Sequence, residues 1–532
     1  MSRKILTTLF LLSFVFSLFI SAELEIYFSP KGGFSPNNNH RMVTLKDGRT
    51  VHADLNNALI EMIENTKEGS TIKIAMYAFG YRPVLDVLVD AAKTRNIKVK
   101  LILDSIADWT REMHKEVRDR IAAEHESAKQ ENRVFDFQLK EILPQAMVDR
   151  GRWKKIQNDV IIYGTMHEKF GIFFEKDSKI PLHGFCGSAN ISWSAGEVFA
   201  ENRVFFKNEP SMGRQLAEEF ARLWNEFGTE LTKNCQSEIF LPAQTYLGDV
   251  QIISNAKPLD EENWQRIDKV LLDLMEQVNP QNGTLDVAIF SFTHTGLAEK
   301  LLELAERYPN IKVRILMDQT QMVGTDNHQG VLGPYMEKAA EFKNLKNFEI
   351  RYKWRANIYA WDPQLQKCEL IHWRNLLLHH KCLVVNGKRM GLGSYNWSTS
   401  AEFRNFENVM VFFGEVPEHQ KIIRRFMDEF EFIWNSPRPE GKLKEKIVVP
   451  QVISGPKGRE LKQIIVTVYE DPDCKKIMEI LDTNPDGCKE SSLLKSTGLT
   501  TEVLREKTDK LEKATLIFSR VEGEENLYQL AD

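Results

Sequence analysis

The sequence predicts an α/β fold made of two repeated α-β-α lobes with mixed sheets, followed by a small C-terminal domain. Three observations support this prediction. Residues 71–104 and 284–318 repeat one pattern of apolar strand, amphipathic helix and apolar strand. A second pair of blocks, which begin near residues 165 and 378, repeats as well. From about residue 455 the chain departs from both repeats. With 532 residues, 42% of them hydrophobic and 27% charged, the chain is long enough for several packed domains.

The first repeated block is a βαβ unit. Apolar residues recur with helical spacing in its central part. They are Val84, Leu85, Val87, Leu88 and Ala91 in the first copy and Leu297, Leu301, Leu302, Leu304 and Ala305 in the second. The runs at 99–103 and 313–317 are continuously hydrophobic, which is typical of strands buried on both faces. We therefore expect a mixed, largely parallel sheet in each half.

The second repeated block carries polar residues at matched spacing. His167-Glu-Lys169 is followed by Gly187-Ser-Ala-Asn190, and His379-His-Lys381 is followed by Gly393-Ser-Tyr-Asn396. In both copies a Glu-Asn pair begins eleven residues after the Asn, at Glu201 and at Glu407. A chance strand edge would explain one such copy, but matched offsets in two copies favour a working site.

These residue types suit a phosphate diester. Side chains alternate between the faces of a strand, so each His and the Lys two residues later project together. The Lys and the Asn amide would hold the non-bridging oxygens. One imidazole would form a phosphohistidine, while the other protonates the leaving oxygen and then activates water. Each Glu would orient the imidazole that it faces. The predicted catalytic residues are His167, Lys169, Asn190, Glu201, His379, Lys381, Asn396 and Glu407, with Ser188 and Ser394 assigned to substrate binding.

No metal or cofactor is expected in this site. The groups beside the imidazoles are Lys and Asn side chains and not paired carboxylates. The sequence also lacks a close Cys/His pattern of the kind that binds zinc.

The two His-x-Lys and Gly-Ser-x-Asn sets resemble the paired HKD signatures of the phospholipase D superfamily. The resemblance covers residues 24 to 440. The segments 24–33 and 74–79 are especially similar to the superfamily's small bacterial endonucleases, which act as dimers of one-motif chains. This chain carries both halves, so a monomer is expected to be sufficient for catalysis.

The resemblance implies the fold, the two-step covalent mechanism and the absence of a metal cofactor. It also implies that His167 is the nucleophile and His379 the general acid. The sequence departs from the family pattern at one position: the Asp expected seven residues after each motif His is Phe174 or Asn386. Active members such as the tyrosyl-DNA phosphodiesterases also lack that Asp, so activity is still expected.

The N-terminus has the regions of a secretory signal: basic residues, an apolar run at 5–20, and small residues near Ala22. We expect residues 1–22 to be removed and the protein to be secreted or periplasmic. A membrane anchor is the alternative. The expected lobes then span residues 23–240 and 241–445. Among six cysteines, Cys186 and Cys382 are expected to be reduced core residues, and Cys474 and Cys488 are close enough in sequence to bridge.

Basic and aromatic residues are interleaved in the insertion before each motif. The candidate substrate-binding residues there are Arg152, Trp153, Trp354, Arg355, Trp373 and Arg374. They suit either stacking on a nucleic-acid strand or contact with lipid headgroups at a membrane surface. A net charge of −5 argues against a generally basic coat, so any polyanion site must be local. The charged stretch 109–130 is expected on the surface as a lid or arm.

Residues 455–532 are expected to form a separate domain that resembles a winged helix. Helical patterns lie at 474–481, 491–495 and 501–513, and a strand pair is expected at 516–520 and 526–530. Such a domain would bind DNA or support dimerisation. Taken together, the sequence favours an exported nuclease; the alternatives are a phospholipase D and, with less support, a non-catalytic binding protein.

Overall fold

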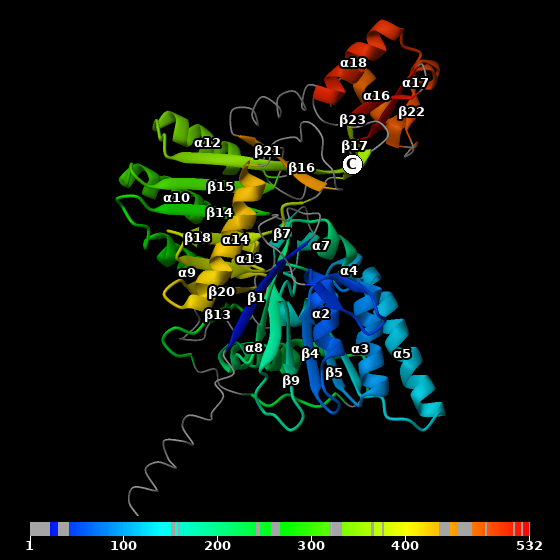
Figure 1. Cartoon of the computed structure of the whole chain (residues 1–532), viewed down its shortest axis with the longest axis vertical. Helices are drawn as coiled ribbons and strands as arrows, with labels where there is room; N and C mark the ends of the chain where they lie inside the picture. Colours follow the sequence, from blue (N-terminus) through cyan, green and yellow to red (C-terminus); the bar gives the residue numbers. More distant parts are fainter. Residues whose placement is uncertain are drawn as a thin grey trace, which may run out of the picture.

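Two α/β lobes lie against each other in the computed structural model, and a small C-terminal unit lies beyond the second lobe (Figure 1). The structure describes residues 22–29, 42–149, 155–157, 160–162, 164–233, 235–240, 245–256, 266–318, 321, 332–362, 367–374, 377–435, 447–454, 471–482, 484, 487–513, 517–522 and 525–530. Most of the predicted signal, residues 1–21, lies outside these residues.

Lobe 1 contains the first βαβ unit and the first His motif. Its strands are β1 (Glu23–Phe28), β2 (Met42–Thr44), β3 (Thr50–His52), β4 (Thr71–Met76), β5 (Lys98–Asp104), β6 (Phe137–Ile142), β7 (Lys155–Gln157), β8 (Val160–Ile162), β9 (Lys169–Phe174), β10 (His183–Gly187), β11 (Asn202–Lys207) and β12 (Gly228–Glu230). Its helices are α2 (Leu55–Glu64), α3 (Arg82–Thr94), α4 (Asp108–Met113), α5 (Lys115–Gln130), α6 (Pro144–Asp149), α7 (Trp193–Glu197), α8 (Pro210–Arg222) and the π-helix η1 (Leu223–Phe227).

Lobe 2 repeats this plan with the second His motif. Its strands are β13 (Gln251–Ser254), β14 (Thr284–Ile289), β15 (Lys312–Asp318), β16 (Phe348–Asp362), β17 (Lys367–Arg374), β18 (Lys381–Val385), β19 (Arg389–Gly393), β20 (Asn408–Phe413) and β21 (Ile447–Ser454). Its helices are α9 (Ile267–Met275), α10 (Thr295–Arg307), α12 (Leu332–Phe342), α13 (Thr399–Phe403) and α14 (Pro417–Asn435). Strand β21 pairs with β16, so this sheet continues past the lobe end expected at residue 445.

Both main sheets are mixed, as predicted. Their strand orders are β1-β11-β10-β9-β4-β5-β6-β12 and β13-β20-β19-β18-β14-β15-β16-β17. The expectation that they are largely parallel is wrong. Only the βαβ strands and their next neighbour are parallel, in β4-β5-β6 and β14-β15-β16. The second repeated block adds the antiparallel runs β9-β10-β11 and β18-β19-β20, in which β9–β10 and β18–β19 are hairpins.

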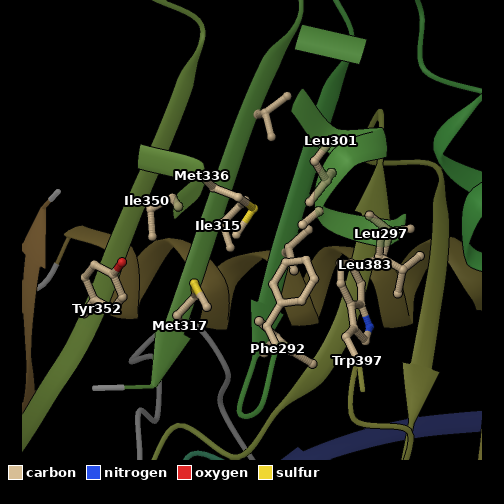
Figure 2. Packing of buried hydrophobic residues seen from close by; sticks show 14 of the residues in the cluster. Phe292, Leu297, Leu301, Ile315, Met317, Met336, Ile350, Tyr352, Leu383 and Trp397 are labelled. Atoms are coloured by element: carbon tan, nitrogen blue, oxygen red, sulfur yellow. The ribbon is translucent and has the colours of Figure 1, made fainter. Parts of the chain in front are cut away.

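The core of lobe 2 supports the second motif directly. Helix α10 lays Leu297 and Leu301 on the sheet, as the helical spacing predicted (Figure 2). Phe292 meets Trp397 edge-on, with ring centroids 4.9 Å apart. Trp397 directly follows Asn396, so this contact holds the end of the Gly-Ser-Tyr-Asn segment on the core.

A further apolar cluster joins the lobes. It contains the buried residues Met166, Ala200, Leu378 and Phe406, which flank the repeated motifs in both halves. Helix α14 of lobe 2 packs on β1 of lobe 1, and α8 of lobe 1 packs on β13 of lobe 2. The two halves therefore bury a common interface next to the catalytic candidates.

Helix α5 packs on lobe 1 and is not a lid. Its Val117, Ile121 and Ala128 are buried in the lobe 1 core, and its buried Glu124 forms an ion pair with Lys93 of α3 over 3.2 Å. The sequence expectation of a lid or arm over 109–130 is therefore wrong, because the sparse apolar residues of this stretch still form one buried stripe.

The C-terminal unit consists of α16 (Pro472–Asp482), β22 (Cys488–Lys489), α17 (Glu490–Thr497), α18 (Thr501–Lys513), β23 (Ile517–Glu522) and β24 (Glu525–Leu530). The three expected helices and the expected strand pair are present, and β22 adds a third strand in the order β22-β24-β23. The assignment as a winged helix and a role in dimerisation stay predictions.

The described cysteines are free thiols. Cys186 and Cys382 are buried in the core, as predicted. The bridge that the sequence spacing of Cys474 and Cys488 allowed is not formed, since both are buried free thiols. Closeness in sequence does not bring two sulfur atoms to bonding distance, which depends on the Cα separation in the fold.

Candidate active site

The two His motifs meet where the lobes touch. The backbone N–H of His167 donates to the carbonyl of Phe406, and that of His379 donates to the carbonyl of Ala200, each over 2.9 Å. Short parallel bridges at Met166 and Phe406, and at Ala200 and Leu378, accompany these bonds. Each His is thus held against the segment that precedes the Glu of the other repeat.

The two imidazoles are paired with carboxylates across the lobe boundary. His167 Nδ1 lies 2.9 Å from an oxygen of Glu407, and His379 Nδ1 lies 2.5 Å from an oxygen of Glu201. Both carboxyl groups are fully buried, and each His is 8% exposed. A carboxylate that accepts from Nδ1–H leaves Nε2 of the ring as the basic atom. Each ring therefore has one nitrogen available for the reaction.

The serines of the Gly-Ser-x-Asn segments support these carboxylates. Ser188 Oγ donates to Glu201 over 2.5 Å, and Ser394 Oγ donates to Glu407 over 2.7 Å. Both serines are fully buried. Their predicted role in substrate binding is therefore wrong in this geometry: each hydroxyl is used to hold a Glu in place.

The two motif lysines are bound to the backbone of the motif histidines. Lys169 Nζ donates to the backbone carbonyl of His167 over 2.5 Å, and Lys381 Nζ donates to that of His379 over 2.7 Å. Both lysines are buried. A buried ammonium group on the same segment as a motif imidazole favours binding of a phosphate anion.

The two motif asparagines are half-buried. In the described part of the chain, the side-chain oxygens of Asn190 and Asn396 have no hydrogen-bond partner. The loop of the first is held by buried Arg203, which donates to the carbonyls of Ala189 over 3.1 Å and Asn190 over 3.2 Å. Sequence reasoning missed Arg203, because the matching residue of the second repeat is Val409 and no repeated signal exists.

Burial sets the protonation of the site. It lowers the pKa of His167 to about 4 and that of His379 well below its ordinary value. It also lowers the pKa of Lys169 to about 8 and that of Lys381 to about 7. A phosphate anion in the site would oppose these shifts, since its charge stabilises the cationic forms.

Two aspartates that sequence reasoning did not single out hold the motif backbones. Asp104 accepts the N–H of Met166 over 2.9 Å, and Asp318 accepts the N–H of Leu378 over 2.7 Å. Each accepted N–H belongs to the residue just before a motif His. A signal was available, since both βαβ units end in Asp after an apolar strand. Matched Asp residues at the catalytic ends of β5 and β15 are a positioning device.

Aromatic rings line the two imidazoles unequally. Tyr77 lies against His167 with ring centroids 4.7 Å apart, and Phe290 lies against His379 at 4.6 Å. Trp109 of α4 meets Tyr77 edge-on at 5.3 Å and is 50% exposed. The exposed indole of Trp109 is therefore separated from His167 only by the ring of Tyr77.

The remaining predicted substrate-binding residues are only partly placed. Trp354 and Arg355 belong to β16, and Trp373 and Arg374 to β17, which pair antiparallel. Arg152 and Trp153 lie outside the described residues. Contact of these six residues with a substrate stays a prediction.

Neither a cluster of metal ligands nor a membrane-spanning helix is present among the described residues. Within them, no three His, Cys, Asp or Glu side chains are grouped to hold a metal ion. None of the helices placed by the structure is both long and apolar enough to cross a bilayer.

Both lobes match one family model. Residues 59–224 and 274–434 match the family described as "Cardiolipin synthase, PLD-like domain". The two segments include both His-x-Lys motifs and both Gly-Ser-x-Asn motifs, together with Glu201 and Glu407.

The chain is also similar to curated proteins over part of its length. It is 25% identical over 174 residues to the mitochondrial cardiolipin hydrolase of Danio rerio, which is 32% of this chain and 61% of that protein. For the Homo sapiens protein of that name the identity is 25% over 172 residues, 32% of this chain and 54% of that protein. The chain thus spans little more than half the length of these relatives.

Two solved structures resemble the chain. One is a phosphatidylserine synthase of Haemophilus influenzae, with a TM-score of 0.48 and 14% identity over 89% of this chain and 94% of that one. The other is Nuc of Salmonella typhimurium, a phospholipase D family member, with a TM-score of 0.25 and 17% identity over 36% of this chain and 99% of that one.

Proposed function

The chain belongs to the phospholipase D superfamily, and on that premise we propose that it hydrolyses phosphodiesters without a metal ion through a phosphohistidine on His167. The observation that carries the proposal is the pair of crossed His–Glu contacts, at 2.9 Å and 2.5 Å, together with the two buried motif lysines. Two oriented imidazoles and two ammonium groups supply every group that the two-step reaction requires.

In the first step, His167 Nε2 forms a bond to phosphorus while the bond from phosphorus to the leaving oxygen breaks. His379 gives that oxygen its proton. In the second step, water passes a proton to His379 as its oxygen bonds to phosphorus, and the phosphorus–nitrogen bond breaks. The enzyme returns to its starting protonation.

A nucleic-acid strand is the substrate that we favour. The support is Trp109, which is 50% exposed and packs on Tyr77 beside His167. A base next to the scissile phosphate would stack on this indole, a contact worth about 1–3 kcal/mol per base. The apolar N-terminal run supports export of such a nuclease.

A phospholipid is the second candidate substrate. The curated relatives are named cardiolipin hydrolases. The segment that links β12 to β13 carries exposed apolar and aromatic residues that suit a membrane surface. They are Ile239, Phe240, Tyr246 and Leu247.

The test measures turnover by the chain without residues 1–22 in excess EDTA, on single- and double-stranded DNA and on cardiolipin-containing vesicles. His167→Asn and His379→Asn should abolish turnover. His183→Asn is the matched control, because His183 is a half-buried His whose ring accepts the N–H of Asn208. A need for metal, or activity that survives both motif substitutions, would contradict the mechanism.

Trp109→Ala separates the two substrates. If DNA is the substrate, this variant should raise KM for DNA about tenfold or more, and DNA binding should weaken steeply with salt. Lipid turnover with inert DNA would instead establish the second candidate.

A further inference from the structure

The two His–Glu pairs differ in the number of donors on the carboxylate. Glu407 receives three: His167 Nδ1 at 2.9 Å, Ser394 Oγ at 2.7 Å and the side-chain N–H of Asn405 at 3.0 Å. Glu201 receives His379 Nδ1 and Ser188 Oγ, each at 2.5 Å. In the described part of the chain, no third side-chain donor reaches Glu201.

The third donor to Glu407 comes from a position that both repeats have but that only the second fills with a donor. Asn405 lies two residues before Glu407, and the residue two before Glu201 is Phe199. The backbones match, since Phe406 donates to the carbonyl of Thr165 and Ala200 donates to that of Leu377, each over 2.8 Å. The difference between the two pairs therefore lies in the side chain and not in the local fold.

The two side chains are used in different ways. The Asn405 oxygen accepts the N–H of Thr165 over 3.1 Å, which turns its amide N–H groups toward Glu407. The Phe199 ring lies against His379, with centroids 6.2 Å apart, and has no group to donate. Among the described residues, the carboxylate beside His167 thus accepts three hydrogen bonds, whereas the carboxylate beside His379 accepts two.

We propose that Asn405 and Phe199 are positioning residues that assign the two histidines their different roles. Asn405 keeps Glu407 ionised, so His167 rests as a neutral ring with a nucleophilic Nε2. Phe199 leaves Glu201 with a higher proton affinity than Glu407, so the Glu201–His379 pair holds the proton for the leaving oxygen. The inference rests on the proposed phosphodiesterase function.

The protonation of the two carboxyl groups agrees with this division. Burial would raise the pKa of Glu407, but the imidazole of His167, Lys169 and the Ser394 hydroxyl hold it below its ordinary value. Burial raises the pKa of Glu201 to about 8. A buried carboxyl with fewer donors is easier to protonate.

Charged groups contribute to the difference, since the imidazole of His167 is the largest influence that lowers the pKa of Glu407. The ionisable groups that face Glu407 are His167, Lys169, Lys381, Tyr77, Tyr395 and Glu168, and those that face Glu201 are His379, Lys381, Lys169 and Arg203. Both lysines face both carboxyl groups. Arg203 faces only Glu201 and would favour its ionised form, which is opposite to the direction observed.

The test alters the two positions separately. Asn405→Leu removes the donor with little change in size, and Phe199→Asn adds one. Phe199→Leu is the matched control, since it removes the ring without adding a donor. The readout is the pH dependence of the single-turnover rate at saturating enzyme, where bound phosphate keeps both lysines charged.

Asn405→Leu should move the acidic limb of the profile up by about one pH unit, a tenfold change in proton affinity. Phe199→Asn should move the alkaline limb down by about as much, and Phe199→Leu should move neither. Asn405→Leu that lowers the rate at every pH without moving a limb would overturn the proposal. Should that variant unfold, Phe199→Asn decides alone, and an unmoved alkaline limb overturns the proposal.

Failure of the proposed function would look different. In that case the unaltered chain has no phosphodiester turnover, and no profile exists to shift. If the unaltered chain turns over a phosphodiester but neither Asn405→Leu nor Phe199→Asn moves a limb of the pH–rate profile, only the division of roles between the histidines is refuted.

Discussion

Glu407→Gln tests whether each motif histidine depends on a carboxylate of the other lobe, because it removes the lobe 2 charge that contacts His167 of lobe 1. As His167 bonds to phosphorus, its ring becomes cationic and its hydrogen bond to the ionised Glu407 becomes an ion pair. Such a bond to a charged group contributes about 1.5–3 kcal/mol. Since roughly 1.4 kcal/mol corresponds to a tenfold rate, the first step should slow about tenfold to a hundredfold.

The assay compares two phosphodiesters, one with an alkoxide and one with a p-nitrophenoxide leaving group. The second leaving group needs no proton. Glu407→Gln should be slow on both substrates, because it weakens the nucleophile. Glu201→Gln should be slow on the first and recover on the second, because Glu201 serves the acid, His379.

Glu402→Gln is the matched control for the loss of a buried carboxyl in lobe 2. Glu402 is fully buried and accepts the N–H of Asp268. Among the described residues, it forms no hydrogen bond with either motif histidine. It should keep both rates within about threefold. Recovery of Glu407→Gln on p-nitrophenoxide would refute the crossed assignment, and so would identical behaviour of the Glu407 and Glu201 variants.

Three further predictions concern groups that support the site. Asp104→Ala should lower kcat about tenfold by releasing the N–H of Met166, and an unchanged kcat in the folded variant would contradict the positioning role. Burial lowers the pKa of Lys381 to about 7, so its charge is present below pH 7 and is lost above it. KM should therefore rise between pH 6 and 8, and Lys381→Met should show a high KM that is independent of pH there. Arg203→Met should lower the free energy of unfolding by about 3 kcal/mol, because the carbonyls of Leu55, Ala189 and Asn190 lose their donor. A urea titration measures this change, and a loss below about 1 kcal/mol would count against the structural role of Arg203.

Short-range patterns were sufficient for much of the fold. The helices α3 and α10 follow from apolar residues at helical spacing, and the βαβ units follow from the runs on either side. The sense of the remaining strands did not follow, because hydrophobic runs do not specify which neighbour a strand joins. Hairpins such as β9–β10 made most pairings antiparallel.

The site shows the same division. Matched spacing in two repeats selected the motif His, Lys, Asn and Glu residues; the structure brings each His to the Glu of the other repeat, and the catalytic roles stay predictions. The spacing misassigned Ser188 and Ser394, since only their burial shows that they face Glu201 and Glu407. It also passed over Arg203, which has no counterpart in the other repeat.

By itself the sequence determined that the chain has two halves and which residue types each half brings to a phosphate. The tertiary structure alone decided that each imidazole is served by the other half, since His167 and Glu407 are 240 residues apart and His379 and Glu201 are 178 apart. The physical reason is that periodicity acts over a few residues, whereas this pairing depends on burying the shared apolar cluster between the lobes. The same burial places Asn405 on one carboxylate and Phe199 beside the other pair; the repeats show that the two residues differ but not what they contact.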